Sequence, residues 1–345
     1  MSSYLGIKRW YLTFLEKEKK NWLENILFFF LLILSYLFGM IVSLRNFLYD
    51  KRILKVYHIN RKVISIGNIC WGGSGKTSLA IYLFRKLASK FKVAVITKGY
   101  AEDEYRLLKD NLKKVFDDKN RIKLIRRLVN DFDIFILDDA FQYRKLDRDL
   151  DIVVIRKDEL LRSKYLLPAS SFREPLTSLK RADIVIITYS EAKRQDYYRE
   201  KVLEANSKLK VFFADYIFKG FLDRDKKLVS LEYFKGRKLG VLTAIGYPQG
   251  FLGKLKSIDL WIGKVEIFPD HYCFSPEEIT LLEESFIKEG IKDIIITYKD
   301  YYHLDFTRAN LNYFIFCVEL KILEEDKFLR YIEDVLTDKV SLQVG

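Results

Sequence analysis

The segment Gly72-Gly73-Ser74-Gly75-Lys76-Thr77-Ser78 combines three glycines, one lysine and three hydroxyl side chains in seven positions. It follows the apolar, β-branched run 61–67, which is typical of a buried strand, and it opens the helix-compatible stretch 77–90. Glycines let backbone N–H groups turn toward one anion, and the following helix adds its positive N-terminal end. This strand–loop–helix order predicts a P-loop that binds a nucleoside triphosphate within an α/β fold.

In a P-loop the lysine contacts the β- and γ-phosphates and the next hydroxyl binds Mg²⁺, which assigns these tasks to Lys76 and Thr77. The general pattern has glycine six residues before the lysine, where this chain has Cys70. A glycine-rich turn without a ligand is the alternative. The complete Gly-Gly-Ser-Gly-Lys-Thr core favours the nucleotide site.

Two carboxylates, Asp138 and Asp139, directly follow the apolar run 134–137. A P-loop protein needs an acidic residue at the end of a neighbouring strand to hold Mg²⁺, directly or through water. Paired acids at a strand end also occur as plain helix caps. Because a P-loop precedes them in this chain, we expect Asp138 and Asp139 to be metal ligands.

The rest of the chain alternates short apolar runs with polar, helix-compatible stretches. Runs of this kind are typical of strands buried on both faces of a parallel sheet. They occupy 61–67, 92–97, 133–137, 151–155 and 183–188, and then 238–246, 292–300 and 312–320. The pattern predicts a P-loop NTPase-like, doubly wound and mostly parallel sheet, followed by a smaller α/β domain.

Four parts are therefore expected. They are an N-terminal membrane-associated segment (1–55), a P-loop domain (56–209), a β-ribbon linker (210–237) and a smaller C-terminal α/β domain (238–345). In the last part, Ser275-Pro276-Glu277-Glu278 predicts a helix start with a capping box, and Gly290 predicts its end.

Residues 26–44 form nineteen consecutive positions without a charge. A helix of this length covers roughly the 30 Å apolar core of a bilayer. A buried core helix is the alternative, and membrane insertion is favoured. Whether the helix spans the bilayer or lies in one leaflet stays open.

The formal charge of +13, with Lys+Arg 60 against Asp+Glu 47, favours an anionic partner but does not choose between nucleic acid, acidic lipid and a phosphorylated substrate. Three separated cysteines without a CxxC pair suggest neither a zinc site nor a disulfide framework. Three histidines argue against a histidine-rich metal centre, and His58 and His303 are interpreted as ordinary residues. A GTPase is disfavoured, because the lysine of Thr297-Tyr298-Lys299-Asp300 stands one place too late for a guanine motif.

Several further motifs stand in one order along the chain. They are Gly67-Asn68 before the P-loop, Asp138-Asp139-Ala140-Phe141-Gln142, Arg173-Glu174-Pro175-Leu176, Gly246-Tyr247-Pro248-Gln249-Gly250-Phe251 and Phe268-Pro269-Asp270-His271. The series resembles the tetraacyldisaccharide 4′-kinase (lipid A 4′-kinase) family of Gram-negative bacteria. The resemblance implies transfer of the ATP γ-phosphate to the 4′-hydroxyl of a tetraacylated glucosamine disaccharide 1-phosphate. It implies work at the cytoplasmic face of the bacterial inner membrane, with no nucleic acid and no obligate protein partner.

The resemblance also implies roles for single residues. The family's S-R-G-Y and G-D-E-P-type pieces correspond to 97–100 and 102–105, which makes Asp103 the candidate general base and His271 the histidine that tunes it. Arg173 is expected to neutralise phosphate charge, Glu174 to bind sugar hydroxyls or assist Mg²⁺, and Gln142 to position the nucleotide or a metal-bound water.

Two other functions stay open on the sequence. One is a membrane-associated P-loop ATPase that couples hydrolysis to a protein partner. The other is a basic, membrane-anchored adaptor whose P-loop only binds nucleotide. A hydrolase should release phosphate without lipid, and an adaptor should keep its function when Asp138 and Asp139 are changed.

Overall fold

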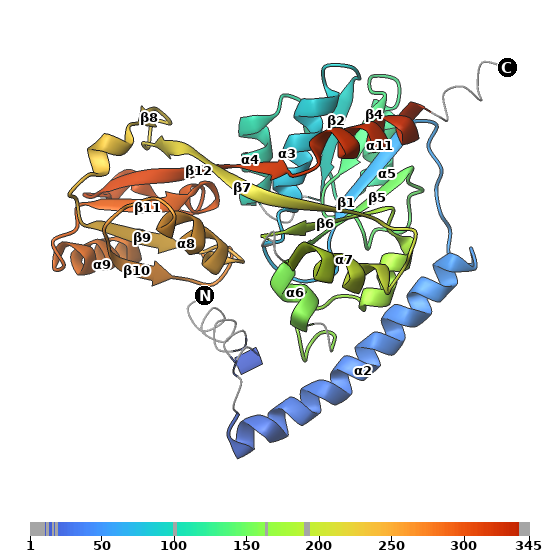
Figure 1. Cartoon of the computed structure of the whole chain (residues 1–345), viewed down its shortest axis with the longest axis horizontal. Coiled ribbons are helices and arrows are strands. Elements are labelled where there is room, and N and C mark those ends of the chain that lie inside the picture. The colour runs from blue at the N-terminus through green and yellow to red at the C-terminus, as the bar shows by residue number, and fades with distance from the viewer. Residues whose placement is uncertain are drawn as a thin grey trace. The chain divides into compact units, whose positions relative to one another are not determined.

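The computed structural model describes residues 11, 14, 15, 17, 20–98, 102–162, 165–189 and 194–337. The chain divides into two compact units (Figure 1). The P-loop unit comprises Phe14–Tyr100, Leu108–Asp215 and Leu320–Gly345, and the second unit comprises Met1–Thr13, Ala101–Leu107 and Tyr216–Glu319. Strands β7 and β12 run from one unit into the other.

The sheet of the P-loop unit has the strand order β7-β6-β5-β1-β4-β2-β3, and every pairing along it is parallel. Its strands are β1 (Lys62–Gly67), β2 (Val93–Thr97), β3 (Val115–Asp117), β4 (Ile134–Leu137), β5 (Leu150–Arg156), β6 (Ile184–Thr188) and the first part of β7 (Lys210–Leu222). The five continuous apolar runs expected here all form strands. The short edge strand β3 lacks such a run, because an edge strand is not covered on both faces.

Helices cover both faces of this sheet, which confirms the doubly wound architecture. On one face α5 (Arg121–Leu128), α6 (Lys157–Arg162), η1 (Leu176–Arg181) and α7 (Gln195–Leu203) pack on the sheet. On the other face lie α3 (Lys76–Leu87) and α11 (Glu325–Thr337), where Phe328 of α11 packs against Tyr82 and Phe212. Helix α4 (Glu102–Asn111) begins in the second unit and ends in the P-loop unit.

The second unit contains a parallel sheet of order β10-β9-β11-β12. Its strands are β9 (Leu239–Thr243), β10 (Ile262–Ile267), β11 (Asp293–Thr297) and β12 (Asn312–Ile322), and β8 (Leu228–Val229) pairs antiparallel with the end of β7. Phe251 and Leu255 of α8 (Pro248–Lys256) pack on one face, and Ile279 and Phe286 of α9 (Pro276–Ile287) on the other. Short helices η3 (Leu231–Phe234), α10 (Tyr298–Tyr301) and η4 (Phe306–Arg308) complete the unit.

Helix α9 starts and ends where the sequence predicts. The Ser275 side chain accepts a hydrogen bond from the Glu278 backbone, the Glu278 side chain accepts one from the Ser275 backbone, and Pro276 is the first helical residue. Gly290 has φ +73°, the left-handed conformation that closes a helix.

The two compact units differ from the four expected parts, since residues 14–55 group with the P-loop unit and the division after Asp215 falls inside the expected linker 210–237. Residues 320–345 group with the P-loop unit, because α11 packs on α3 and β7. Residues 101–107 group with the second unit, although they lie in the middle of the expected P-loop domain. The sequence could not indicate that 320–345 belong with the P-loop unit or that 101–107 belong with the second unit, because both groupings depend on contacts between distant segments.

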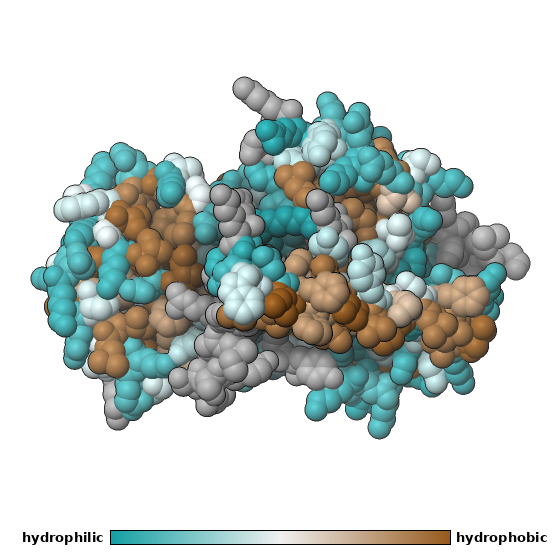
Figure 2. All heavy atoms as spheres, turned by 90° about the horizontal axis from the view of Figure 1, so that it is seen from below, coloured by the Kyte–Doolittle hydropathy of each residue, from teal (hydrophilic) through white to brown (hydrophobic). Residues whose placement is uncertain are grey.

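The N-terminal apolar run forms part of α2 (Trp22–Asp50), 29 residues long and opened by an Asn21–Glu24 capping box. Within the described residues, α2 is the helix long and apolar enough to cross a membrane. Only Ser35 and Val42 are buried along it, so a buried core helix is excluded. Its many exposed apolar side chains form a band on the surface (Figure 2).

Candidate functional site

The predicted P-loop turns between β1 and α3 with Gly72 and Gly75 at φ +121° and +100°, values that L side chains rarely adopt. Gly73 lies between them, Gly75 is the N-cap of α3, and Ser78 lies in the first turn of that helix. Two hydrogen bonds stabilise the loop. The Asn68 amide donates to Ser74 Oγ (3.1 Å), and the Gln142 amide donates to the Asn68 carbonyl (2.7 Å). Gln142 thus supports the entry to the loop.

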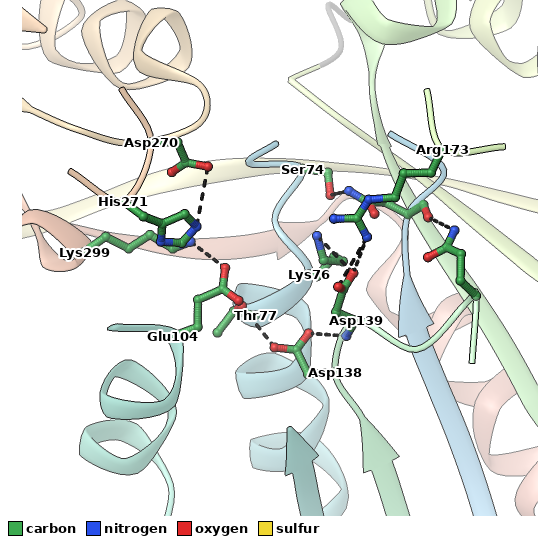
Figure 3. A network of polar contacts seen from close by, with 12 residues as sticks. Ser74, Lys76, Thr77, Glu104, Asp138, Asp139, Arg173, Asp270, His271 and Lys299 are labelled. Atoms are coloured by element: carbon green, nitrogen blue, oxygen red, sulfur yellow. Dashed lines mark hydrogen bonds and ion pairs between the residues drawn. The ribbon is translucent and has the colours of Figure 1, made fainter. Parts of the chain in front are cut away.

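Thr77 and Asp138 meet at the start of α3. The Thr77 hydroxyl donates to Asp138 Oδ2 at 3.1 Å, and both residues are buried (Figure 3). This pair offers only oxygen ligands, which Mg²⁺ prefers, and it lies beside the loop that would hold the phosphates. The donor set therefore fits a magnesium ion held by Thr77 and Asp138.

The Asp139 carboxylate forms ion pairs with two cationic side chains. It lies 3.5 Å from Lys76 Nζ and 3.2 Å from an Arg173 Nη, and both side chains point toward it in Figure 3. Burial raises the pKa of Asp139, but the charges of Lys76 and Arg173 outweigh burial and lower this pKa to about 2. Asp139 also has a left-handed φ of +47°. Two cations beside a P-loop can meet phosphate oxygens, as expected for Lys76 and Arg173.

Arg121 is a site residue that the sequence did not indicate. Its guanidinium donates to the backbone carbonyls of Asp138 and Asp139, and the residue is only 1% exposed. The arginine begins α5 beside the buried residues Ile122, Leu124 and Ile125. A charged residue at the edge of an apolar helix face was the available signal, but a solvent-exposed position gives the same pattern.

The segment around Arg173 is bonded directly to the P-loop. Cys70 pairs with Phe172 in an isolated antiparallel bridge, the Trp71 N–H donates to the Ser171 carbonyl (2.7 Å), and the Arg173 N–H donates to the Ile69 carbonyl (2.8 Å). Cys70 is fully buried in the same core cluster as Phe172. Position 70 is therefore a packed strand position here, which explains why a side chain replaces the general pattern's glycine.

Glu174 does not fit the expected contact with sugar hydroxyls or Mg²⁺. Its carboxylate is fully buried, accepts hydrogen bonds from Arg45 (3.1 Å) and Asn46 (2.9 Å), and forms an ion pair with Arg181 (3.0 Å). Arg45 and Asn46 belong to α2, so Glu174 fastens the apolar helix to the segment that follows Arg173. The sequence could not separate the two roles, because a buried ion pair and a ligand-binding acid use the same residue types.

We expect Glu174→Gln to destabilise the protein by about 3–5 kcal/mol, because the buried carboxylate would be neutralised and Arg181, whose side chain is only 14% exposed, would lose its counter-charge. Chemical denaturation measures the loss. Glu319→Gln is the matched control, since Glu319 pairs with Lys219 at 2.8 Å on the surface and exposed pairs contribute at most about 1 kcal/mol. Equal losses in the two variants would contradict the buried network.

The ion pair between Glu174 and the two arginines also predicts that stability depends on pH. Burial raises the pKa of Glu174, but Arg181 and Arg45 with the Asn46 and Ser178 hydrogen bonds lower it overall. A depressed carboxyl pKa adds stability above the unfolded pKa of about 4.3, and this stability is lost as the pH falls toward the folded pKa. The stability difference between wild type and Glu174→Gln should therefore shrink below about pH 4, which denaturation at several pH values measures.

Gly67 holds the P-loop strand against the segment after Asp139. A Cβ at this position would lie 2.5 Å from Phe141 Cβ and 2.6 Å from the Phe141 nitrogen. We expect Gly67→Ala to cost about 1–3 kcal/mol through overpacking and to lower the melting temperature. Gly253→Ala is the control, because a Cβ there meets nothing within 4 Å and alanine favours a helix interior. A Gly67→Ala protein as stable as Gly253→Ala would refute the close approach.

A second polar cluster lies in the second unit. The Asp103 carboxylate, on the first turn of α4, is 2.9 Å from His271 Nδ1 and 3.2 Å from His303 Nε2, and both contacts involve Oδ2. Asp103 is 2% exposed, whereas the His271 side chain is 37% exposed. The structure thus brings Asp103 and His271 together as expected. It also places His303, which the sequence interpretation left as an ordinary residue, beside Asp103.

Charges around this cluster keep the Asp103 carboxylate ionised. Burial raises the pKa of Asp103, but the contacts with His271 and His303 and the Lys299 charge hold it well below its usual range. The hydrogen bond to Asp103 raises the pKa of His271. Lys299 pairs with Glu104 at 2.7 Å, and Asp270 lies 3.6 Å from His271 Nε2 (Figure 3). A buried, ionised carboxylate beside an accessible imidazole suits general-base chemistry.

The described site residues therefore form one cluster in each unit. Lys76, Thr77, Asp138, Asp139 and Arg173 gather in the P-loop unit, and Asp103 with His271 gather in the second unit. Gly99 and Tyr100, which belong to the motif expected just before Asp103, lie outside the described residues.

Comparison with known proteins gives a consistent match. The family model "Tetraacyldisaccharide-1-P 4′-kinase" matches residues 27–106 and 101–337. A tetraacyldisaccharide 4′-kinase of Aquifex aeolicus is 33% identical, with 72% of this chain and 84% of the relative aligned. One of Flavobacterium psychrophilum is 30% identical, with 92% and 99% aligned.

A solved structure agrees with these matches. The "apo" form of LpxK from Aquifex aeolicus in complex with ATP superimposes with a TM-score of 0.70 at 30% identity. The comparison covers 90% of this chain and 99% of that one. The family match over residues 27–106 and 101–337 includes the segments that carry both clusters.

Proposed function

Because the chain belongs to the tetraacyldisaccharide-1-P 4′-kinase family, we infer that it is a lipid A disaccharide 4′-kinase. It transfers the γ-phosphate of ATP to the 4′-hydroxyl of a tetraacylated glucosamine disaccharide 1-phosphate. The observation that carries this conclusion is the family match, which extends through both units from residue 27 to residue 337.

The P-loop cluster handles the phosphate groups. Backbone N–H groups of Gly72–Ser78 and the N-terminus of α3 would bind the phosphates of ATP, and Lys76 with Arg173 would neutralise the charge of the γ-phosphoryl group. Asp139 holds these two cations in place before the nucleotide arrives, since both contact its carboxylate. Such prearranged charges stabilise a phosphoryl transition state without further reorganisation.

We propose that Thr77 and Asp138 hold Mg²⁺, with Asp139 as a ligand directly or through water. The ion would neutralise negative charge on the phosphate oxygens. The Thr77–Asp138 contact of 3.1 Å supports this role, because it presents two oxygen ligands at the start of α3.

Asp103 and His271 would act together as the general base. As the 4′-oxygen bonds to phosphorus and the bond to ADP breaks, the hydroxyl proton passes to this pair. A strong base is not required, since the phosphoryl transition state is loose and the hydroxyl loses its proton late. The ionised Asp103 stabilises a positive charge on His271, and the exposed His271 ring can return the proton to solvent.

The exposed apolar surface of helix α2 supports a location of the protein at the membrane. Phe29, Ile33, Leu37 and Leu44 are among its exposed apolar side chains. Figure 2 shows apolar residues gathered in a band on this surface. A substrate with four acyl chains resides in a bilayer, so the enzyme must reach it there. We propose that α2 anchors the protein at the cytoplasmic face of the bacterial inner membrane. The basic surplus suits the anionic 1-phosphate and acidic headgroups.

Incubation of the purified chain with γ-labelled ATP, Mg²⁺ and the disaccharide 1-phosphate in mixed micelles tests the function. Label should enter the lipid and depend on both lipid and Mg²⁺. Free phosphate released equally well without lipid would favour the P-loop ATPase instead. Nucleotide binding without any turnover would favour the adaptor.

A further inference from the structure

We propose that His303 is a positioning residue that holds the Asp103 carboxylate in line with His271. This inference rests on the proposed function, since it assigns His303 to the base of the same reaction. The structure contributes three observations: the convergence of two imidazoles on one oxygen, the burial of His303, and a thiol on the far side of its ring.

Both rings approach the same atom. His271 Nδ1 is 2.9 Å and His303 Nε2 is 3.2 Å from Asp103 Oδ2, with the two ring planes inclined at 81°. A carboxylate held by one contact can rotate about its Cβ–Cγ bond. Two contacts from different directions remove that freedom and keep Oδ2 in hydrogen-bond distance of His271.

The two histidines differ in their access to solvent. The His303 side chain is 11% exposed, and its buried Nε2 contacts Asp103 at ion-pair distance without hydrogen-bond geometry, whereas the His271 side chain is 37% exposed. A proton taken from the substrate can leave through His271 but not readily through His303. The roles therefore separate into proton transfer at His271 and fixed orientation at His303.

The surroundings select one tautomer of His303. An ionised carboxylate only accepts hydrogen bonds, so Nε2 must carry a proton for its 3.2 Å contact with Asp103 to be attractive. A neutral ring then has a bare Nδ1, and this atom lies 3.4 Å from Cys273 Sγ. The thiol can donate to it, while the other acceptor near Sγ, the His271 carbonyl, is farther away at 3.9 Å. Burial, with the negative charges of Asp103 and Glu102, raises the pKa of Cys273 and keeps the thiol protonated.

The backbone fixes the position of the ring. His303 follows α10, and its N–H donates to the Asp300 carbonyl at 2.9 Å. Asp300 is fully buried and accepts from the Ala244 N–H, while the Ala244 carbonyl accepts from the His271 N–H at 3.1 Å. Asp300 thus connects the turns that carry the two histidines, so their spacing around Asp103 is set by the fold.

Substitutions that place a donor at one ring position or the other test the proposal. Glutamine can put an amide N–H near the Nε2 position, and asparagine puts one near the Nδ1 position. We expect His303→Asn and His303→Ala to lower kcat by about tenfold or more with an unchanged KM for ATP, because the close contact of the ring N–H with the charged Asp103 carboxylate is lost. His303→Gln should recover most of kcat. Equal kcat values for the Gln and Asn variants, or no loss in either, would overturn the proposal.

A second measurement does not depend on activity. The chain contains three histidines, so ¹⁵N-histidine labelling yields three imidazole signals that His58→Gln and His303→Gln assign. His58 is the matched reference, since its ring is 76% exposed beside Asp147 at 3.3 Å. His303 should show the Nε2–H tautomer, and Cys273→Ala, but not Cys273→Ser, should shift its populations. A Nδ1–H tautomer for His303 would refute the assignment.

Assays of the wild type distinguish a failure of the proposed kinase activity from a failure of the proposed role of His303. If the wild type does not label the lipid, the proposed function fails and the kinetic test of His303 does not apply, while the tautomer measurement still decides the geometry. If the wild type labels the lipid and His303→Ala retains full kcat, only the role of His303 fails. Circular dichroism and thermal unfolding verify that each variant is folded before it is assayed.

Discussion

Replacing Lys76 by alanine is expected to lower the rate of phosphoryl transfer by about 10²- to 10³-fold. The Lys76 side chain reaches the carboxylate of Asp139, 3.5 Å away, where Arg173 also points (Figure 3). A lysine at this place in a P-loop stabilises charge that develops on the γ-phosphoryl group, so its loss should reduce kcat more than ATP binding. Transfer of label from ATP to lipid, measured at saturating ATP, gives the effect.

Lys86→Ala is the matched control for this prediction. Lys86 lies on the same helix, α3, and its ammonium group pairs with Glu325 at 2.7 Å on the surface. Its removal should change transfer little, because an exposed pair contributes little energy. Most of the wild-type rate remaining in Lys76→Ala would disprove the assigned task of the P-loop lysine.

Replacing Asp103 by alanine should reduce kcat by about 10²- to 10⁴-fold, the usual contribution of a general base, with a smaller change in KM. The loss follows from the contact between Asp103 and His271 at 2.9 Å, since the imidazole would lose both its orientation and the negative charge that stabilises its protonated form. Steady-state kinetics with varied lipid and varied ATP separate kcat from KM. Asp103→Asn tests the charge alone.

Asp110→Asn serves as the control on the same helix. Asp110 is exposed near the end of α4, whereas Asp103 is buried in its first turn. A kcat of Asp103→Ala equal to that of Asp110→Asn would remove Asp103 as the base. A stability loss alone can be recognised, because it would reduce the amount of folded enzyme without changing kcat per folded molecule.

Much of this fold could be predicted because its signals are local. Strands β1, β4, β5 and β6 are continuous apolar runs, and only strands buried on both faces require that pattern. Edge strand β10 was not predicted, since its residues alternate between half-buried and exposed positions along part of its length. The short edge strand β3 was missed for the same physical reason.

The site residues also divide into those with a local sequence signal and those without one. Lys76 and Thr77 could be named from the sequence, because a P-loop is built from consecutive residues whose backbone conformation glycine permits. His271 and Asp103 are 168 positions apart, and only the motif order connected them before the structure placed them in contact. Arg121 and His303 carry no local signal that distinguishes them, since a buried arginine and a largely buried histidine look like surface residues in a sequence.

The sequence by itself determined the phosphate loop, the order of the strands' apolar runs, the caps of α9 and the apolar helix. Each depends on neighbouring residues and on the periodicity of one element. Only the tertiary structure decided that Glu174 binds α2 instead of facing a ligand, that α11 packs with the P-loop unit, and that two histidines converge on Asp103. These arrangements depend on the burial of charged groups, whose partners come from distant segments that only the folded chain brings together.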